Sequence, residues 1–376
     1  MTTSHPEHTS DHAAARSCPG IAVPEQLGPE KESLADFTVK ERKAPVISWY
    51  RTPLPKELFK ELHQKDDRKG AFLVFGHLGL RLALAAAAVC SSIYFPWPVT
   101  VAILFCFGTV AAFDNGVHEL GHATVFKSKA ANRFFCRVFA FLGWFNHETF
   151  NASHTRHHRY TLHPPDDLEV VLPLRLMVRH FLLTGFVDPV RAWKTFLTHV
   201  RIARGKFEGE WELTLYPPDD QDSRSAPVRW SRTVLAGHGL IALAAVATGQ
   251  WIVLPLVTFA PFYASWLFFL CNNTQHIGLQ DFVPDFRLCC RTFTLSPFVR
   301  FLYWNMNYHT EHHMYAAVPS YNLARLHAAI RHDLPPTPHG LVAVWKQIAE
   351  IQARQEKDPS YQFQPELPAP RAAAAA

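Results

Sequence analysis

Residues 233–280 read TVLAGHGLIALAAVATGQWIVLPLVTFAPFYASWLFFLCNNTQHIGLQ and contain no aspartate, glutamate, lysine or arginine. A helix needs about 20 residues to cross the hydrocarbon core of a bilayer. The stretch is therefore long enough for two crossings. Gly249-Gln250-Trp251 would form the turn between them, because glycine permits tight turns and tryptophan favours the membrane–water interface. We predict membrane spans over about 232–249 and 251–271.

A second apolar stretch covers residues 70–115 and is divided by Pro96-Trp97-Pro98. It predicts two further spans, over about 71–95 and 98–117. Arg81 lies inside the first of them. Because a charge within the membrane is costly, its side chain must snorkel to the interface or face other helices. The alternative is one pair of membrane spans combined with buried helices of a soluble core.

The remaining residues divide the chain into three parts. Residues 1–45 mix serine, proline, histidine and charges without periodicity, which predicts a disordered tail without a secretory signal. Residues 346–376 predict a C-terminal tail. Between them, residues 46–345 form the predicted membrane domain. The expected fold is an all-α integral membrane protein, with four transmembrane helices in two hairpins and a cytosolic helical cap.

Charge predicts the orientation of these hairpins. Neither turn between paired spans carries a lysine or arginine, whereas residues 1–70, 123–231 and 282–376 carry nearly all of them. Cytoplasmic loops of membrane proteins are enriched in these residues. We therefore expect a multi-pass protein with both termini and the middle segment in the cytosol. Its membrane would be the endoplasmic reticulum in a eukaryote or the inner membrane in a bacterium.

Composition argues against two other classes of protein. The net charge of +5 arises from 37 basic and 32 acidic residues without a lysine- or arginine-rich tract, so nucleic-acid binding has little support. The seven cysteines show no CxxC spacing, which argues against a disulfide scaffold or a zinc knuckle.

Three histidine boxes carry the predicted chemistry. Residues 118–122 read HELGH, residues 154–158 read HTRHH and residues 309–313 read HTEHH. Positions i, i+3 and i+4 share one face of a helix, and imidazole is the commonest metal ligand among side chains. Eight histidines exceed what one ion can bind, so we predict two metals. The eight are His118, His122, His154, His157, His158, His309, His312 and His313.

The predicted topology brings the boxes to one side of the membrane, because they follow span two, lie in the middle segment and follow span four. Nearby carboxylates are expected to orient imidazoles, and the candidates are Asp114, Glu119, Asp166, Asp167 and Glu311. Five of the histidines outside the boxes are expected at the surface or in the core. They are His147, His163, His180, His199 and His238.

Two other functions compete with a redox centre. HELGH also matches the HExxH motif of zinc metalloproteases, with Glu119 as general base. A zinc protease, however, would give no role to a whole HxxHH box. A metal transporter would need polar ligands inside the spans, whereas these histidines lie beyond the span ends.

The boxes, their spacing and the two hairpins resemble the membrane fatty acid desaturase/hydroxylase superfamily over residues 45–345. Asn272-Asn273-Thr274-Gln275-His276 is similar to the NxxxH motif that follows the fourth span in acyl-CoA desaturases. The run from Asn305 to Tyr315, followed by Val318-Pro319, also resembles bacterial desaturase-like hydrocarbon oxygenases.

The resemblance implies two iron ions and a ligand set for each. One set would be His118, His122, His154, His158 and His312. The other would be His157, His276, His309 and His313, with Asn272 acting through a water. It also implies an enzyme that uses O2 to desaturate a fatty-acyl or lipid-like chain, although hydroxylases and ketolases share the boxes.

The electrons that such an enzyme needs are expected from a separate protein. The chain has no HPGG haem module, no GxGxxG after a strand and no cysteine-rich iron–sulfur motif. The predicted donor is cytochrome b5 or ferredoxin with its reductase. Exposed basic residues such as Arg156, Arg159, Arg325 and Arg331 would attract an acidic carrier of this kind.

Overall fold

The computed structural model describes residues 44–174, 176, 181–182 and 184–369. Within these residues the regular elements are all helices, and pairing between extended segments is confined to isolated bridges. The all-α prediction is confirmed for this part of the chain. Residues 1–43, which make up nearly all of the predicted N-terminal tail, lie outside it.

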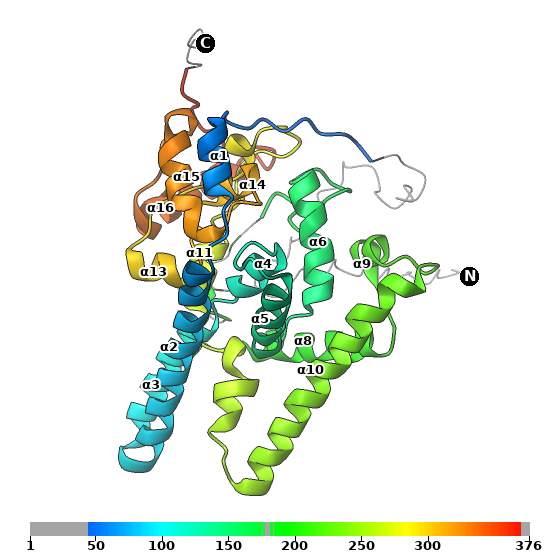
Figure 1. Ribbon diagram of the computed structural model, residues 1–376, viewed down its shortest axis with the longest axis vertical. Helices are drawn as coiled ribbons and strands as arrows, with labels where there is room; N and C mark the ends of the chain where they lie inside the picture. Colours follow the sequence, from blue (N-terminus) through cyan, green and yellow to red (C-terminus); the bar gives the residue numbers. More distant parts are fainter. Residues whose placement is uncertain (1–43, 175, 177–180, 183, 370–376) are drawn as a thin grey trace, which may run out of the picture.

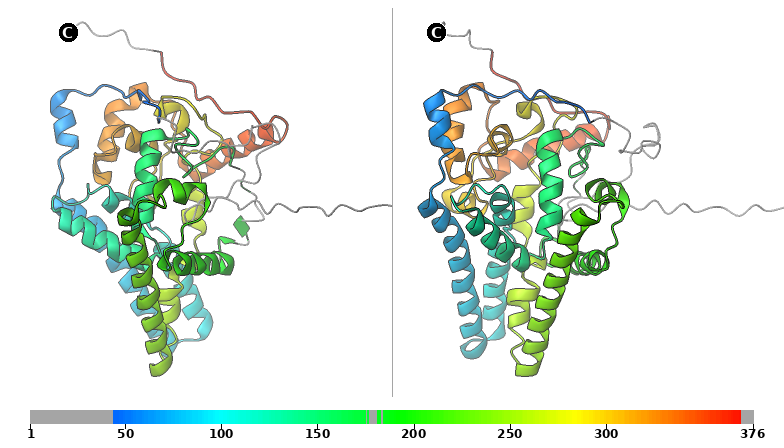
Figure 2. Two further views of the ribbon diagram at one scale, coloured as in Figure 1. Left: turned by 90° about the vertical axis from the view of Figure 1, so that its right-hand side faces the viewer. Right: turned by 45° about the vertical axis from the view of Figure 1, so that its right-hand side comes forward.

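Three long apolar helices project from one end of the molecule (Figures 1 and 2). Helices α2 (Asp67–Tyr94) and α3 (Trp97–Ala111) form an antiparallel pair, and α10 (Gln221–Thr248) stands beside them. Three helical stretches are long and apolar enough to cross a membrane: Lys56–Tyr94, Trp97–Gly121 and Gln221–Thr248. Their exposed side chains include Phe72 and Leu240, as expected for surfaces that face lipid.

The fourth predicted span, 251–271, is not one continuous helix. The segment divides into a π-helical turn, η2 (Leu254–Thr258), a 3₁₀ turn, η3 (Ala260–Phe262), and a short helix, α11 (Trp266–Asn272). The helical hydrogen bonding stops at Tyr263, which is extended, and at Ala264, whose φ is +53°, whereas Pro255 and Pro261 lie in the first turns of η2 and η3, where proline is tolerated. Hydropathy correctly indicates an apolar return segment here, but it does not register this loss of hydrogen bonding.

The other predicted spans also differ from the helices at their ends. Helix α2 begins at Asp67, because the Asp66 carboxylate accepts hydrogen bonds from the amides of Arg68 and Lys69. Helix α3 ends at Ala111, and the chain turns before α4 (Asn115–Gly121). Helix α10 begins well before residue 232, since its polar first turns continue into the apolar part without a break.

Arg81 faces a neighbouring helix and does not snorkel. Its guanidinium is buried and donates to the backbone oxygen of Ala111 at 3.0 Å and to that of Phe113 at 3.4 Å. It also lies 3.5 Å from the Asp114 carboxylate. The cation therefore satisfies backbone carbonyls that the break between α3 and α4 leaves without helical partners.

Shorter helices form a cap over the polar ends of the long helices (Figure 1). They are α1 (Lys56–Leu62), α5 (Lys129–Leu142), α6 (His147–Tyr160), α8 (Pro189–Ala203), α9 (Gly209–Leu215), α12 (Phe286–Cys289), α13 (Pro297–Leu302), α14 (His309–Met314), η4 (Ser320–Asn322), α15 (Leu323–Ile330), η5 (Arg331–Asp333) and α16 (Gly340–Gln355). The domain boundary expected at residue 345 falls inside α16, where Val344 and Ile348 are buried in the largest core cluster.

Candidate metal centre

Each histidine box lies on a different helix. The first box lies on α4 directly after α3, the second on the last turns of α6, and the third forms most of α14. The Asn146 side chain caps α6 by accepting from the amide of Thr149. Every residue of α14 is buried, so the third box sits inside the cap.

Five histidines from the three boxes form a first group: His118, His122, His154, His158 and His312. One ring nitrogen of each lies within 4.8 Å of those of the others. The Nε2 atoms of His154 and His158 are 2.9 Å apart, and those of His158 and His312 are 3.1 Å apart. The group therefore combines one imidazole pair from α4, one from α6 and a single imidazole from α14.

Four further histidines form a second group: His157, His276, His309 and His313. The Nε2 of His309 lies 2.9 Å from that of His276 and 3.1 Å from that of His313. The structure thus brings together all nine histidines predicted as ligands. The two groups have the same members as the two sets that the resemblance implies.

These spacings fit nitrogens that share an ion. Two imidazole nitrogens bound at right angles to one ion, each about 2.1 Å from it, lie about 3.0 Å apart. The Nε2 separations in both groups, 2.9 to 3.1 Å, match this value.

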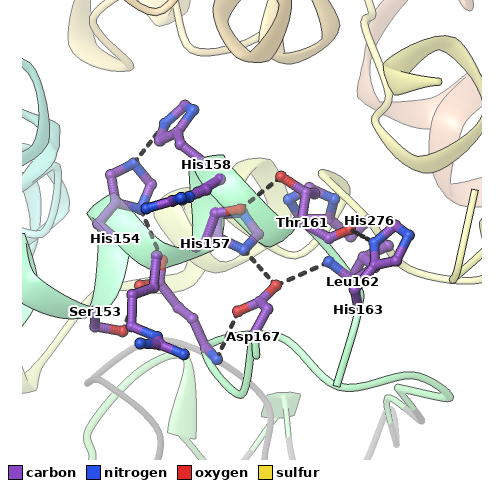
Figure 3. Close-up of polar contacts among 12 residues, drawn as sticks. Ser153, His154, His157, His158, Thr161, Leu162, His163, Asp167 and His276 are labelled. Carbon is purple, nitrogen blue, oxygen red and sulfur yellow. Dashed lines mark hydrogen bonds and ion pairs between the residues drawn. The ribbon is translucent and has the colours of Figure 1, made fainter. Parts of the chain in front are cut away.

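The outer Nδ1 atoms of four of these histidines have buried acceptors. The pairs are His118 with Glu119, His154 with Glu169, His157 with Asp167, and His276 with the backbone oxygen of Cys289, each at 2.8 Å. Figure 3 shows His154 and His157 on α6 with these contacts. An imidazole whose Nδ1–H donates outward presents a bare Nε2, which is the form that binds a metal.

The protonation pattern of the second group favours a cation among its nitrogens. A backbone carbonyl only accepts, so the Nδ1 of His276 carries the hydrogen and its Nε2 is bare. The Thr161 hydroxyl donates to the backbone oxygen of His157 at 2.6 Å and therefore accepts from the Nδ1 of His313 at 3.2 Å. The Nε2 atoms of His276 and His313 therefore carry no hydrogen, and both face the Nε2 of His309. A single hydrogen on that nitrogen can form a hydrogen bond to only one of them.

Three buried nitrogens of the first group have no hydrogen-bond partner among the described residues, namely the Nε2 of His122 and the Nδ1 atoms of His158 and His312, and only the first is an Nε2. An unsatisfied buried polar atom is unfavourable, and a bound ion would satisfy the Nε2 of His122. The residues present therefore fit two metal ions.

Burial keeps most of these imidazoles neutral at pH 7. It lowers the pKa of His276 to about 3. It also lowers the pKa of His154, His158, His309, His312 and His313 well below 6.5. His157 is the exception: burial lowers its pKa, but the charge of Asp167, the hydrogen bond to it and the charge of Glu169 together outweigh burial, so that its pKa is raised. Neutral imidazoles are ready to bind metal, since a ligand nitrogen must be deprotonated.

The five carboxylates expected to orient imidazoles separate into two classes. Glu119 and Asp167 contact ligand histidines. Asp114 faces Arg81, Asp166 lies 3.6 Å from Arg156, and Glu311 contacts His327 and Thr292. Because the Glu119 carboxylate is held on the outer nitrogen of His118, it is poorly placed to act as the general base of a zinc protease.

Sequence reasoning missed Glu169. Its carboxylate contacts the Nδ1 of His154 and accepts from the Ser153 hydroxyl at 2.6 Å. Glu169 lies outside every box and follows His154 across an irregular segment, so no periodicity relates the two residues. The only available signal was its place in a run of acidic residues, Asp166-Asp167-Leu168-Glu169, after the second box.

The remaining predicted residues lie as follows. Asn272 is half-buried at the last position of α11, and its action through a water stays a prediction. His199 and His238 are core histidines whose Nε2 atoms bond to the backbone oxygens of Trp144 and Phe141, each at 3.0 Å. His147 is buried and His163 half-buried, and both lie outside the two groups. His180 lies outside the described residues.

A model of the fatty acid desaturase family matches residues 92–345, which is more than half of the chain. The chain belongs to the fatty acid desaturase family. The match includes all three histidine boxes and His276. Membership implies an oxidoreductase associated with membranes, of a family that generally uses two irons. A search of curated proteins finds no match to this desaturase-family chain.

Proposed function

We propose that this protein is an O2-dependent di-iron oxidoreductase that desaturates a fatty-acyl or lipid-like chain. The observation that carries the proposal is the adjacency of the two histidine groups. His157 and His158 are consecutive but belong to different groups, as do His312 and His313. Ions held by these groups would be close neighbours on a shared rigid frame.

The ligand chemistry supports iron. Imidazole binds iron, copper, nickel and zinc, but zinc has no redox step to offer. Two irons, when bound, would supply the reduction of O2 and the removal of hydrogen from an unactivated C–H bond. The family's general use of two irons agrees with this choice.

The chain's own residues would hold and orient this centre. Glu119, Glu169 and Asp167 fix three imidazole rings through their Nδ1 atoms. Both groups consist of buried or half-buried side chains, which limits the access of water to them. We further propose that Asn272 contributes to the second group through a water.

The position of the site supports a lipid-like substrate. The first box begins directly after α3, so the first group lies at the polar ends of the apolar helices. A chain dissolved in the bilayer could approach from there without crossing water. We propose that electrons come from a separate acidic carrier with its reductase. Arg159 and Arg331 are exposed cations on the cap that would attract it.

The first test is metal content and its dependence on the ligands. The purified full-length protein should hold two irons per chain by elemental analysis. The changes His157→Ala and His312→Ala should each lower the iron content and abolish turnover. The matched control is His332→Ala, which removes an exposed histidine outside both groups and should leave iron and turnover unchanged.

The same preparation tests the reaction. With a lipid substrate, a reductase and an acidic carrier, mass spectrometry should detect an alkene, and high salt should slow turnover. An alcohol as the main product would instead indicate a hydroxylase. Sustained turnover with NAD(P)H alone would refute the separate donor, and one zinc per chain would refute the di-iron proposal.

A further inference from the structure

A basic groove lies at the polar end of α2, away from both histidine groups. Its volume is about 510 Å³, and its walls come from the first turns of α2, from α13 and from neighbouring loop residues. Figures 1 and 2 show α13 beside the upper end of α2, above the long helices. Three cations line the groove, namely Arg68, Lys69 and Arg300, and no carboxylate does.

The cations are available to a ligand. Among the described residues, none of the three forms an ion pair with a carboxylate. Lys69 Nζ makes one long contact with Asn322 Oδ1 at 3.5 Å, and Arg300 Nη1 lies 3.4 Å from the Tyr308 hydroxyl. Arg68 is exposed.

Two nearby carboxylates keep their negative charge but form no ion pair with the three cations. The Asp66 carboxylate accepts hydrogen bonds from the backbone amides of Arg68 and Lys69. The Asp67 carboxylate accepts from the amide of Lys127 at 2.8 Å. Both carboxylates are therefore bound to backbone amides, and the guanidinium and ammonium groups remain free to meet another anion.

Directly below the cations the groove becomes apolar. Phe72 and Leu73 lie one turn further along α2 than Arg68 and Lys69, on the same face. The Phe301 ring lies 5.6 Å from that of Phe72 and rests on Gly76, where any Cβ would meet it. The Phe72 side chain is 70% exposed, so an apolar chain could lie along it.

We propose that this groove binds an anionic phospholipid of the surrounding bilayer. Its phosphate would contact Arg68, Lys69 and Arg300, and one acyl chain would run down α2 over Phe72. Charged donors above an apolar helix surface match a phosphate above its acyl chains, and arginine suits phosphate through paired hydrogen bonds. The proposal does not rest on the metal centre, because no residue of the groove belongs to either histidine group.

The test titrates the purified full-length protein with phosphatidylglycerol and with phosphatidylcholine of the same acyl chains, read out by native mass spectrometry. The groove variant combines Arg68→Gln, Lys69→Gln and Arg300→Gln. The control combines Lys194→Gln, Arg229→Gln and Arg232→Gln, which removes three positive charges from exposed residues of α8 and α10.

We expect the unaltered protein and the control to prefer phosphatidylglycerol by about tenfold or more, and the groove variant to lose this preference. If the groove variant and the control lost the preference for phosphatidylglycerol equally, general electrostatic attraction would explain it and the proposal would be overturned. The proposal would also be overturned if neither variant lost the preference. Binding of glycerol 3-phosphate as tight as that of the lipid would reassign the groove to a soluble phosphate.

Two single changes keep the test decisive if the triple variant fails to fold. Arg68→Gln alters one exposed side chain and should weaken phosphatidylglycerol binding about fivefold. Phe72→Gln keeps every charge and should weaken binding of the long-chain lipid but not of its dihexanoyl analogue. Unchanged binding in both single variants would overturn the proposal.

Discussion

At the scale of single residues, the centre depends on which nitrogen each imidazole presents. Three ligand histidines donate Nδ1–H to a buried carboxylate and one donates to a backbone carbonyl. These contacts hold the rings in place and leave Nε2 to face its neighbours. The outer acceptors are therefore part of the site, although none of them would touch a metal.

Glu169 provides a test of this view, because its contact with His154 was not predicted from the sequence. Removing its side chain in Glu169→Ala leaves the Nδ1 of His154 without an acceptor and frees the ring to rotate. We expect the affinity of the first group for iron to fall about 10- to 100-fold. Dialysis against increasing chelator should then leave about one iron per chain, held by the second group.

The matched control is Glu210→Ala, which removes an exposed carboxylate on α9 and should retain both irons under the same dialysis. Glu169→Gln should behave as an intermediate, since an amide oxygen still accepts a hydrogen bond but carries no charge. Loss of both irons at once from Glu169→Ala would show that the two groups do not bind independently.

At the scale of helices, close approach between apolar segments sets the frame that carries the boxes. Helix α3 ends in a turn that Arg81 stabilises, and α4 then turns the first box toward α6. The broken return segment after η3 lies directly against α3. Tyr263 fits over Gly108 there, because glycine has no Cβ to obstruct it.

This close contact predicts that Gly108→Ala and Gly79→Ala change the free energy of unfolding in opposite directions. In Gly108→Ala, the new Cβ would lie 2.9 Å from the backbone oxygen of Tyr263 and closer still to its ring, so the return segment must shift. We expect a loss of about 1–3 kcal/mol in the free energy of unfolding. The measurement is thermal or denaturant unfolding in detergent.

Gly79→Ala on α2 is the control, because a Cβ at residue 79 would meet nothing within 4 Å. It should stabilise the helix by about 0.5–1 kcal/mol, since alanine loses less backbone entropy than glycine. Equal effects of the two changes would mean that Tyr263 does not rest on α3.

At the scale of the whole molecule, apolar helices project from one end and the charged cap forms the other (Figure 2). The turn that follows α10 lies at the far tip of the apolar helices, whereas the segments before α1 and after α16 lie on the cap (Figure 1). The distribution of lysine and arginine predicts that the cap is cytosolic. The tips of the hairpins would then lie on the opposite side of the membrane.

Site-directed labelling tests this topology. With Cys18 and the exposed Cys90 and Cys106 replaced by serine, cysteines introduced at Ser48 and Ser360 should react with an impermeant reagent only from the cytosolic side. A cysteine at Gln250 should react only from the other side. Labelling of Gln250 and Ser360 from the same side would mean that α10 does not cross the membrane, and the shared side of the boxes would need another explanation.

The resemblance to the desaturase/hydroxylase superfamily implied how the nine histidines divide into two groups. The sequence by itself determined the helical class, the apolar stretches and the three histidine boxes. These features depend on composition and on spacing within one helix, and the spacing of HTRHH already places its histidines on one face of α6. Only the tertiary structure decided three further points: that Arg81 faces Asp114, that the return segment breaks at Tyr263 and Ala264, and that Glu169 holds His154. Contacts between segments depend on how the chain turns between helices, and no periodicity within a helix records those turns.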